Sequence, residues 1–221
     1  MPRRTTYGPG SPCWVDCVTP DPAAAQTCYA GLLDWTFQAE RTGYALITRD
    51  GEVVGGFGAS PVGQAVGRWQ VYLATKDADA SAQQLKELGG TVVAGPFPTG
   101  RTGRIVLAVD PLGASFGLWE GQLGNGIVLI DEPGATCWHE LRTPDVITAG
   151  AFYGGLFPGR FDASALTPGG QARTFSGWVP YFGSHNAAGL YARAMSAGCA
   201  VQGPLVTDPW GATFGVRQLP G

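Results

Sequence analysis

Two acidic residues stand at matching places in two similar segments of the chain. Asp16 lies in Cys13-Trp-Val-Asp-Cys-Val-Thr-Pro-Asp21, and Glu140 lies in Cys137-Trp-His-Glu-Leu-Arg-Thr-Pro-Asp145. Alternate side chains of a strand share a face, so each carboxylate shares its face with the tryptophan two residues before it. A carboxylate beside an apolar ring can be tuned for proton transfer. We therefore take Asp16 and Glu140 as candidate catalytic acids or bases.

The same two residues also have a structural interpretation. A carboxylate on a covered strand face is costly without a partner, and Glu140 has Arg142 two positions further along its own face. Asp16 has no basic residue this close in its own strand, which makes it the stronger candidate for a general base. The two histidines are not candidates for the same site. His139 should face the helix side of its strand, and His185 lies in a loop.

Composition limits the class of partner. Only 14% of the 221 residues are charged and 44% are hydrophobic, and the net charge is −3. Such a chain has no basic surface for nucleic acid or anionic lipid, and it holds no apolar run long enough to span a membrane. The five cysteines are odd in number and form no CxxC motif, which favours reduced core residues over disulfides or a zinc site. We expect a cytoplasmic protein without nucleic-acid or membrane partners.

The chain repeats itself in one order. Beyond the two segments above, Trp69-Gln-Val-Tyr72 returns as Trp178-Val-Pro-Tyr181, and Asp110-Pro-Leu-Gly113 returns as Asp208-Pro-Trp-Gly211. The offset between matching residues falls from 124 in the first pair of segments to 98 in the last, so the second copy is about 26 residues shorter. Such self-similarity indicates a duplicated unit. We expect a first domain over residues 9–121 and a second, shortened domain over residues 127–221.

Each copy has the pattern of paired βαβββ units. The first unit is expected as a strand over 13–19, a helix over 23–33, and strands near 37, over 44–48 and over 53–58. The second is expected as a strand over 69–74, a helix over 78–88 that ends at Gly89-Gly90, and strands over 91–94, 104–109 and 115–119. The fold class is therefore α+β, in two tandem domains.

These paired units, a strand that ends in Thr-Pro-Asp before a helix, and a closing Asp-Pro-Leu-Gly turn resemble the vicinal oxygen chelate superfamily. That superfamily includes glyoxalase I, bleomycin-resistance proteins and extradiol dioxygenases, and the chain is most similar to its tandem two-domain actinobacterial branch. The resemblance covers residues 11–218. It implies a curved sheet in each domain that forms a cup around a ligand.

The resemblance also implies where metal ligands would stand. In the family, His, Gln or Glu side chains on the first strands bind the metal. The corresponding positions in this sequence are Trp14, Gln70, Trp138 and Val179, so the set of ligands is incomplete. The closing-strand glutamate position falls on Gly117 and on Gly215. A metal ion needs several N or O donors that converge on one point. We therefore expect no metal site and no other cofactor.

Large rings and a few polar groups should line the cups instead. The expected ligand-binding residues are Trp14, Gln70, Tyr72, Trp119, Trp138, Arg142, Tyr181 and Arg217. Flat side chains stack on planar molecules, and isolated polar groups fix their orientation. The sequence thus predicts a metal-free protein that binds a small, largely planar apolar molecule, aromatic or polycyclic, such as a natural product or an antibiotic, for sequestration or self-resistance.

Two other functions remain open at this point. A metal-independent biosynthetic isomerase, cyclase or lyase would use Asp16 or Glu140 as general acid or base. A scaffold without a ligand would use the tryptophans only to fill the cups. Because one chain already carries both copies, either a monomer or a homodimer is expected.

Overall fold

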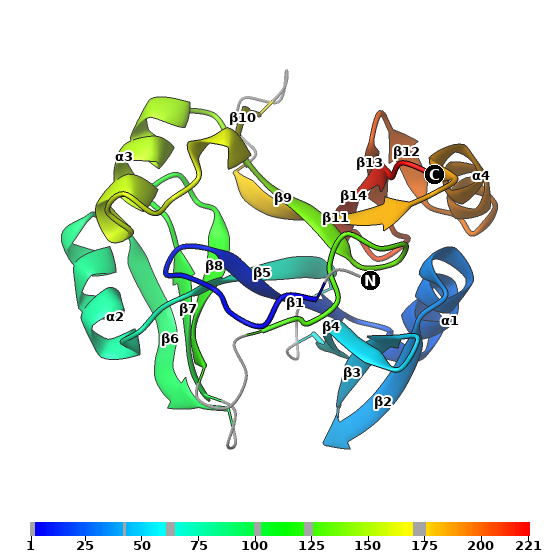
Figure 1. Ribbon diagram of the computed structural model, residues 1–221, viewed down its shortest axis with the longest axis horizontal. Helices are drawn as coiled ribbons and strands as arrows, with labels where there is room; N and C mark the ends of the chain where they lie inside the picture. The colour runs from blue at the N-terminus through cyan, green and yellow to red at the C-terminus, as the bar shows by residue number, and fades with distance from the viewer. Residues whose placement is uncertain (1–2, 42, 61–64, 100–102, 122–125, 170–175) are drawn as a thin grey trace.

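The computed structural model describes residues 3–41, 43–60, 65–99, 103–121, 126–169 and 176–221. Two β-sheets form its centre, one of eight strands from the first half and one of six strands from the second half. Figure 1 shows α1 and α4 together at one end of the molecule and α2 and α3 together at the other. Each of these helix pairs therefore combines one helix from each half.

The first half contains β1 (Pro12–Thr19), α1 (Pro22–Leu33), β2 (Thr36–Arg41), β3 (Tyr44–Arg49), β4 (Glu52–Ala59), β5 (Arg68–Ala74), α2 (Ala78–Glu87), β6 (Thr91–Pro98), β7 (Gly103–Val109) and β8 (Ser115–Gly121). The strand order is β2-β3-β4-β1-β5-β8-β7-β6. β1 and β5 pair antiparallel at the centre, and each also pairs parallel with the last strand of its own unit. The paired βαβββ units expected from the sequence are confirmed.

The second half contains β9 (Thr136–Thr143), α3 (Val146–Leu156), a 3-10 turn (Ala163–Ala165), β10 (Leu166–Pro168), β11 (Gly177–Ser184), α4 (Ala187–Ser196), β12 (Ala200–Gln202), β13 (Leu205–Thr207) and β14 (Thr213–Gln218). The strand order is β10-β9-β11-β14-β13-β12. β10 pairs parallel with β9 as β4 does with β1. Among the described residues, the second half has no counterpart of the β2–β3 hairpin, and β12 and β13 are short.

The helices begin where the sequence places a capping side chain. Asp21, Asp77, Asp145 and Asn186 each accept a hydrogen bond from a backbone N–H in the first turn of the following helix. Such a cap satisfies a donor that the helix itself leaves unpaired. Asn186 stands where the other three copies have aspartate and caps α4 in the same way.

One buried cluster joins α1 to the second half. The Tyr29 hydroxyl donates to Asp208 Oδ2 over 2.9 Å and accepts from Trp69 Nε1 over 3.1 Å. The other carboxylate oxygen of Asp208 accepts the backbone N–H groups of Trp210 and Ala212. The Asp-Pro turn of the second half is thus anchored by a tyrosine of the first.

The second buried cluster is the reciprocal of the first. The Tyr153 hydroxyl of α3 donates to Asp110 Oδ2 over 3.2 Å and accepts from Trp178 Nε1 over 2.9 Å. Asp110 also accepts the backbone N–H groups of Leu112 and Ala114. The repeated Tyr, Trp and Asp residues therefore belong to the contact between the two halves.

The main hydrophobic core runs through this contact. Phe182 of β11 packs against Trp35 and Trp69, with ring centroids 4.9 and 5.2 Å away. Buried residues of both halves belong to the same cluster, which excludes water from the space between the sheets. No helix in the described part of the chain is long and apolar enough to cross a membrane.

Candidate functional site

Alternation along β1 separates core from candidate site. Val15 and Cys17 are fully buried in the main core, while Trp14 and Asp16 lie on the other face and are partly exposed. We call this face of the eight-stranded sheet, with Trp14, Asp16, Gln70, Tyr72 and Trp119, the first cup. β1, β5 and β8 bring these five residues to one surface, as the sequence predicted.

Asp16 is held by donors from several strands. Its Oδ1 accepts a hydrogen bond from Trp14 Nε1 over 2.8 Å and another from the Tyr44 hydroxyl over 2.9 Å. Tyr44 reaches it from β3 across Gly56, where a Cβ atom would lie 2.1 Å from Asp16 Oδ1. Hydrogen bonds to a charged acceptor are the stronger kind, so this arrangement fixes the carboxylate in place.

Tyr72 completes the polar centre of the first cup. Burial, the nearby Asp16 charge and a hydrogen bond to Asp16 raise the pKa of Tyr72 well above its ordinary value. The phenol is therefore neutral and can donate its proton in a hydrogen bond. Beside it, Gln70 Oε1 accepts from Ser115 Oγ over 2.9 Å, and Gln70 Nε2 is buried without a partner in the described part of the chain.

Aromatic side chains form one wall of the first cup. The rings of Trp14 and Trp119 meet edge to face, with centroids 5.2 Å apart and an interplanar angle of 84°. Both are half-buried and pack in a small apolar cluster with Tyr72, Ile105 and Leu107, and Trp14 also packs against the main core. Such a wall offers flat apolar area next to the Asp16 carboxylate.

The corresponding face of the six-stranded sheet, with Trp138, Glu140, Arg142, Tyr181 and Arg217, is the second cup. The Tyr181 hydroxyl donates to Glu140 Oε2 over 2.5 Å, and Arg142 Nε forms an ion pair with the same oxygen over 3.3 Å. Burial and the hydrogen bond to Glu140 raise the pKa of Tyr181 above its ordinary value. The buried Glu140 is thus neutralised within its own sheet.

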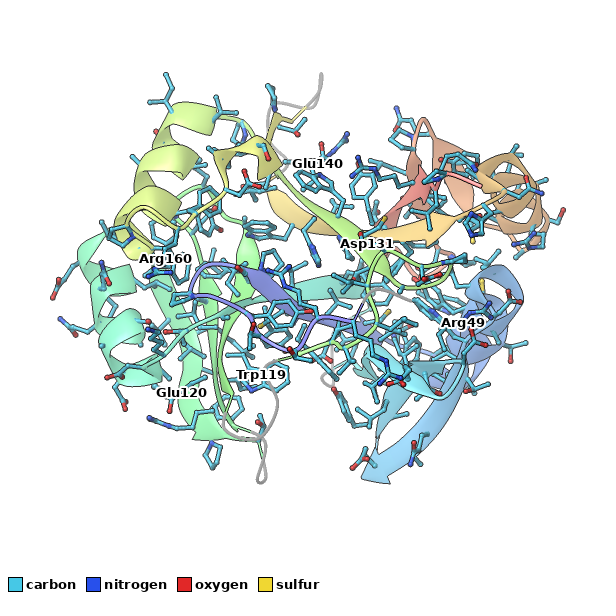
Figure 2. The ribbon with its side chains drawn as sticks, in the orientation of Figure 1. Arg49, Trp119, Glu120, Asp131, Glu140 and Arg160 are labelled. Carbon is cyan, nitrogen blue, oxygen red and sulfur yellow. The ribbon has the colours of Figure 1, made fainter. Side chains whose placement is uncertain are left out.

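Trp138 and Arg217 form the remainder of the second cup. The Arg217 guanidinium lies over the Trp138 ring, 5.8 Å from its centroid. Figure 2 shows Glu140 and Trp119 on opposite sides of the molecule. These two residues, one from each cup, therefore lie far apart in this view.

The positions that the resemblance assigns to metal ligands do not fit a metal ion. A Cβ atom at Gly117 would lie 2.0 Å from the Tyr72 ring, and one at Gly215 would lie 2.3 Å from the Tyr181 ring. These rings fill the space that a carboxylate at either position would need. Within the described ranges, no three His, Cys, Asp or Glu side chains are grouped closely enough to hold a metal.

Two features of the site lie outside the expectations from sequence. Tyr44, a direct donor to Asp16, was not among the expected site residues. Its β3 position, 28 residues from Asp16, gives no signal without the hairpin that carries it across Gly56. His139 lies on the opposite side of β9 from Glu140, as alternation predicted, but it lines a cavity beside the N-terminal segment, which the expected helix-facing position did not include.

The sequence of this chain is similar to a known domain family and to several known proteins. Residues 13–119 match the glyoxalase-like domain family. The protein named "Putative glyoxylase CFP32" from Mycobacterium tuberculosis (strain CDC 1551 / Oshkosh) is 29% identical over 99% of this chain and 98% of its own. "Anthracycline biosynthesis protein DauV" from Streptomyces sp. (strain C5) is 29% identical over 97% of this chain and 95% of its own.

Solved structures share the fold over the whole chain. The Mn(II)-bound glyoxalase from Novosphingobium aromaticivorans has a TM-score of 0.59 and 14% identity over 99% of this chain and 84% of its own. An extradiol ring-cleaving dioxygenase from B.fuscum has a TM-score of 0.62 and 15% identity over 98% and 74%. At these identities the likeness shows a common architecture and no more.

Proposed function

We propose that the first cup of this chain, whose residues 13–119 match the glyoxalase-like domain family, binds a small, largely planar organic molecule without a metal ion. The observation that carries the proposal is the Trp14–Trp119 pair beside a carboxylate that is already fixed by Trp14 and Tyr44. A flat apolar ligand gains buried area against the rings, and the polar groups orient it.

The relatives favour a natural product as the ligand. Two relatives that align with 97% of this chain are named for anthracycline biosynthesis. An anthracycline is built on a fused, planar ring system, which suits a cup walled by tryptophan. We propose that the protein sequesters such a compound, as a self-resistance protein does, and releases it unchanged.

Metal independence is part of this proposal and rests on side chains. The glyoxalase neighbour is Mn(II)-bound, whereas here Tyr72 and Tyr181 fill the space above the two glycines at the closing-strand positions. Binding by stacking and hydrogen bonds needs no ion. We therefore expect full binding after treatment with a chelator.

A metal-independent enzyme is the second candidate. The observation that favours it is the cluster of Asp16, Tyr44 and Tyr72, because a carboxylate next to neutral phenols can accept a proton from a bound ligand and return it elsewhere. Such a protein would act as an isomerase, cyclase or lyase in natural-product biosynthesis. In this case Asp16 is the general base, while Glu140, paired with Arg142, is less suited to the role.

One experiment separates the two candidates. The purified protein is treated with EDTA, incubated with an anthracycline aglycone and examined by native mass spectrometry, with metal analysis of the same sample. A stoichiometric complex from which the aglycone is recovered unchanged supports sequestration. Recovery of a compound with altered mass or retention time supports the enzyme, and loss of that change in Asp16→Asn assigns the base. Binding that returns only with an added metal would contradict both.

A further inference from the structure

A cavity of about 240 Å³ lies where the two halves of the chain meet; its lining includes Trp138 of the second cup and none of the five residues of the first cup. Its walls come from the N-terminal segment, the residues before β9, β9 itself and the segment after α3. The lining residues used below are Arg4, Tyr7, Asp131, His139, Arg160 and Asp162. Figure 2 shows two residues of this lining, Arg160 beside α3 and Asp131 beside β9.

Two arginines at the cavity have no opposite charge bound to them. The Arg4 guanidinium lies over the Tyr7 ring, 4.4 Å from its centroid, and Arg4 Nε donates to the Thr6 carbonyl. Neither Arg4 nor Arg160 forms an ion pair within the part of the chain that the structure describes. Guanidinium groups in this state are ready donors to a carboxylate.

Neither acidic residue of the lining forms an ion pair with these arginines in the part of the chain that the structure describes. Asp162 Oδ1 accepts the Ser164 backbone N–H at the start of the 3-10 turn. Asp131 is exposed to solvent, which stabilises its charge at the rim. The lining thus carries two basic and two acidic side chains, and Arg4 and Arg160 remain available as donors to a bound carboxylate.

His139 gives the wall a polar group without charge. Burial lowers the pKa of His139 to about 3, with a smaller contribution from Arg4, so the imidazole is neutral near pH 7. Its Nε2 is buried and has no hydrogen-bond partner among the described residues. A buried polar atom without a partner costs free energy, and a bound molecule or water is an ordinary reason for its presence.

We infer that this cavity is a binding site for a small organic carboxylate, separate from the ligand of the first cup. The carboxylate group lies at the rim with Arg4 and Arg160, and the carbon skeleton lies inward beside Tyr7 and His139. A volume of about 240 Å³ is below the range of pockets for drug-sized ligands, so the occupant is smaller than the polycycle proposed for the first cup.

The two histidines of the chain allow a direct test with benzoate as the probe. Protein with ¹⁵N-labelled imidazoles is titrated with sodium benzoate at constant ionic strength, and the ring signals are followed by NMR. We expect saturable shifts of the His139 signals and no shift of His185, which lies exposed in the loop between β11 and α4. Benzamide, which has the same ring without the charge, should bind at least about tenfold more weakly.

Charge variants locate the carboxylate. Arg4→Gln and Arg160→Gln should each raise the Kd for benzoate at least about tenfold, because each removes a charge-assisted hydrogen bond. Arg3→Gln is the matched control, since Arg3 adjoins Arg4 in sequence but pairs with Glu52, and its Kd should stay within about twofold of wild type.

Three results would overturn the inference. They are the absence of a His139 shift at millimolar benzoate, equal affinity for benzamide, and an unchanged Kd when Arg4→Gln and Arg160→Gln are combined. Because none of the five residues of the first cup lines the cavity, these results are independent of the function proposed for the first cup.

Discussion

The two cups hold a carboxylate at the same place on equivalent strands, yet they stabilise it with different neighbours. In the first cup, Asp16 accepts from Trp14 and from Tyr44 of the β2–β3 hairpin. In the second cup, the described chain has no such hairpin, and Glu140 binds Arg142, which stands where the first copy has Val18. Where the first half has the β2–β3 hairpin with Tyr44, the second half thus has the charge of Arg142 on β9.

This difference indicates which cup is available for a ligand. Glu140 is buried, with 6% of its surface exposed. Asp16 is partly exposed, beside an aromatic wall. The contact between the halves, in contrast, is the same in both copies. The two halves therefore share the same buried Tyr, Trp and Asp contacts but differ in the side chains around the cup carboxylates.

The largest expected effect tests whether the two buried Tyr–Asp contacts between the halves contribute equally to stability. Asp110→Ala and Asp208→Ala should each lower the free energy of unfolding by about 4 kcal/mol, because each leaves buried backbone N–H groups and a tyrosine hydroxyl without an acceptor. Urea denaturation measures both. The exposed Asp79→Ala is the control and should change stability by less than about 0.5 kcal/mol. If the two variants lose very different free energies of unfolding, the two contacts are not equivalent.

The next effect tests a feature that the cups share. Gly117→Ala and Gly215→Ala should each cost about 2 to 3 kcal/mol, because the new methyl group meets the Tyr72 or Tyr181 ring at 2.0 or 2.3 Å. Gly154→Ala in α3 is a control with no atom close to the added methyl group. Thermal unfolding measures all three. A neutral Gly117→Ala would show that Tyr72 moves aside and that the closing-strand position has room.

A smaller effect tests the difference between the cups. Arg142→Leu should lower the free energy of unfolding by about 2 kcal/mol, less than for a fully buried pair because Arg142 keeps partial exposure. Tyr44→Phe should cost about 1 kcal/mol, the value of one hydrogen bond to a partly exposed carboxylate. Urea denaturation compares the two. The interpretation fails if Tyr44→Phe is the more damaging change.

The smallest effect is a pH dependence from the interior. Burial raises the pKa of Asp110 and Asp208 above the ordinary value, so the folded protein holds these protons more tightly than the unfolded chain. Their contribution to stability is complete below the unfolded pKa and is lost as the pH rises through the folded pKa. The free energy of unfolding of an Asp110→Asn, Asp208→Asn variant should therefore increase relative to that of wild type as the pH rises above the ordinary pKa of an aspartate, about 4. A constant difference would contradict this.

Much of the fold could be predicted from sequence because it is repeated. Matching segments with falling offsets placed the strands, and aspartates before apolar runs placed the starts of the helices. Alternation also placed Trp14 and Asp16 on one face, because side chains of a strand follow a fixed period. The repeat, the capping aspartates and the strand alternation are local features of the sequence, so they can be recognised without knowledge of tertiary contacts.

The contacts between distant elements could not be predicted in this way. Tyr44 meets Asp16 only because the hairpin crosses Gly56, and Tyr29 meets Asp208 only because α1 packs on the other half of the chain. The recurrence of Trp69 as Trp178 and of Asp110 as Asp208 shows in the sequence that these residues belong to the repeat. It did not show that each tyrosine binds the aspartate of the opposite copy.

The central claim is that the first cup, and not the second, binds a planar ligand without a metal. Its most direct test is the Kd of an anthracycline aglycone for EDTA-treated wild type, Trp14→Ala and Trp138→Ala, followed by tryptophan fluorescence. We expect tight binding to the metal-depleted wild type, a loss of about 30-fold or more in Trp14→Ala and less than about twofold in Trp138→Ala. Binding that requires an added metal, or that is lost in Trp138→Ala but kept in Trp14→Ala, would contradict the claim.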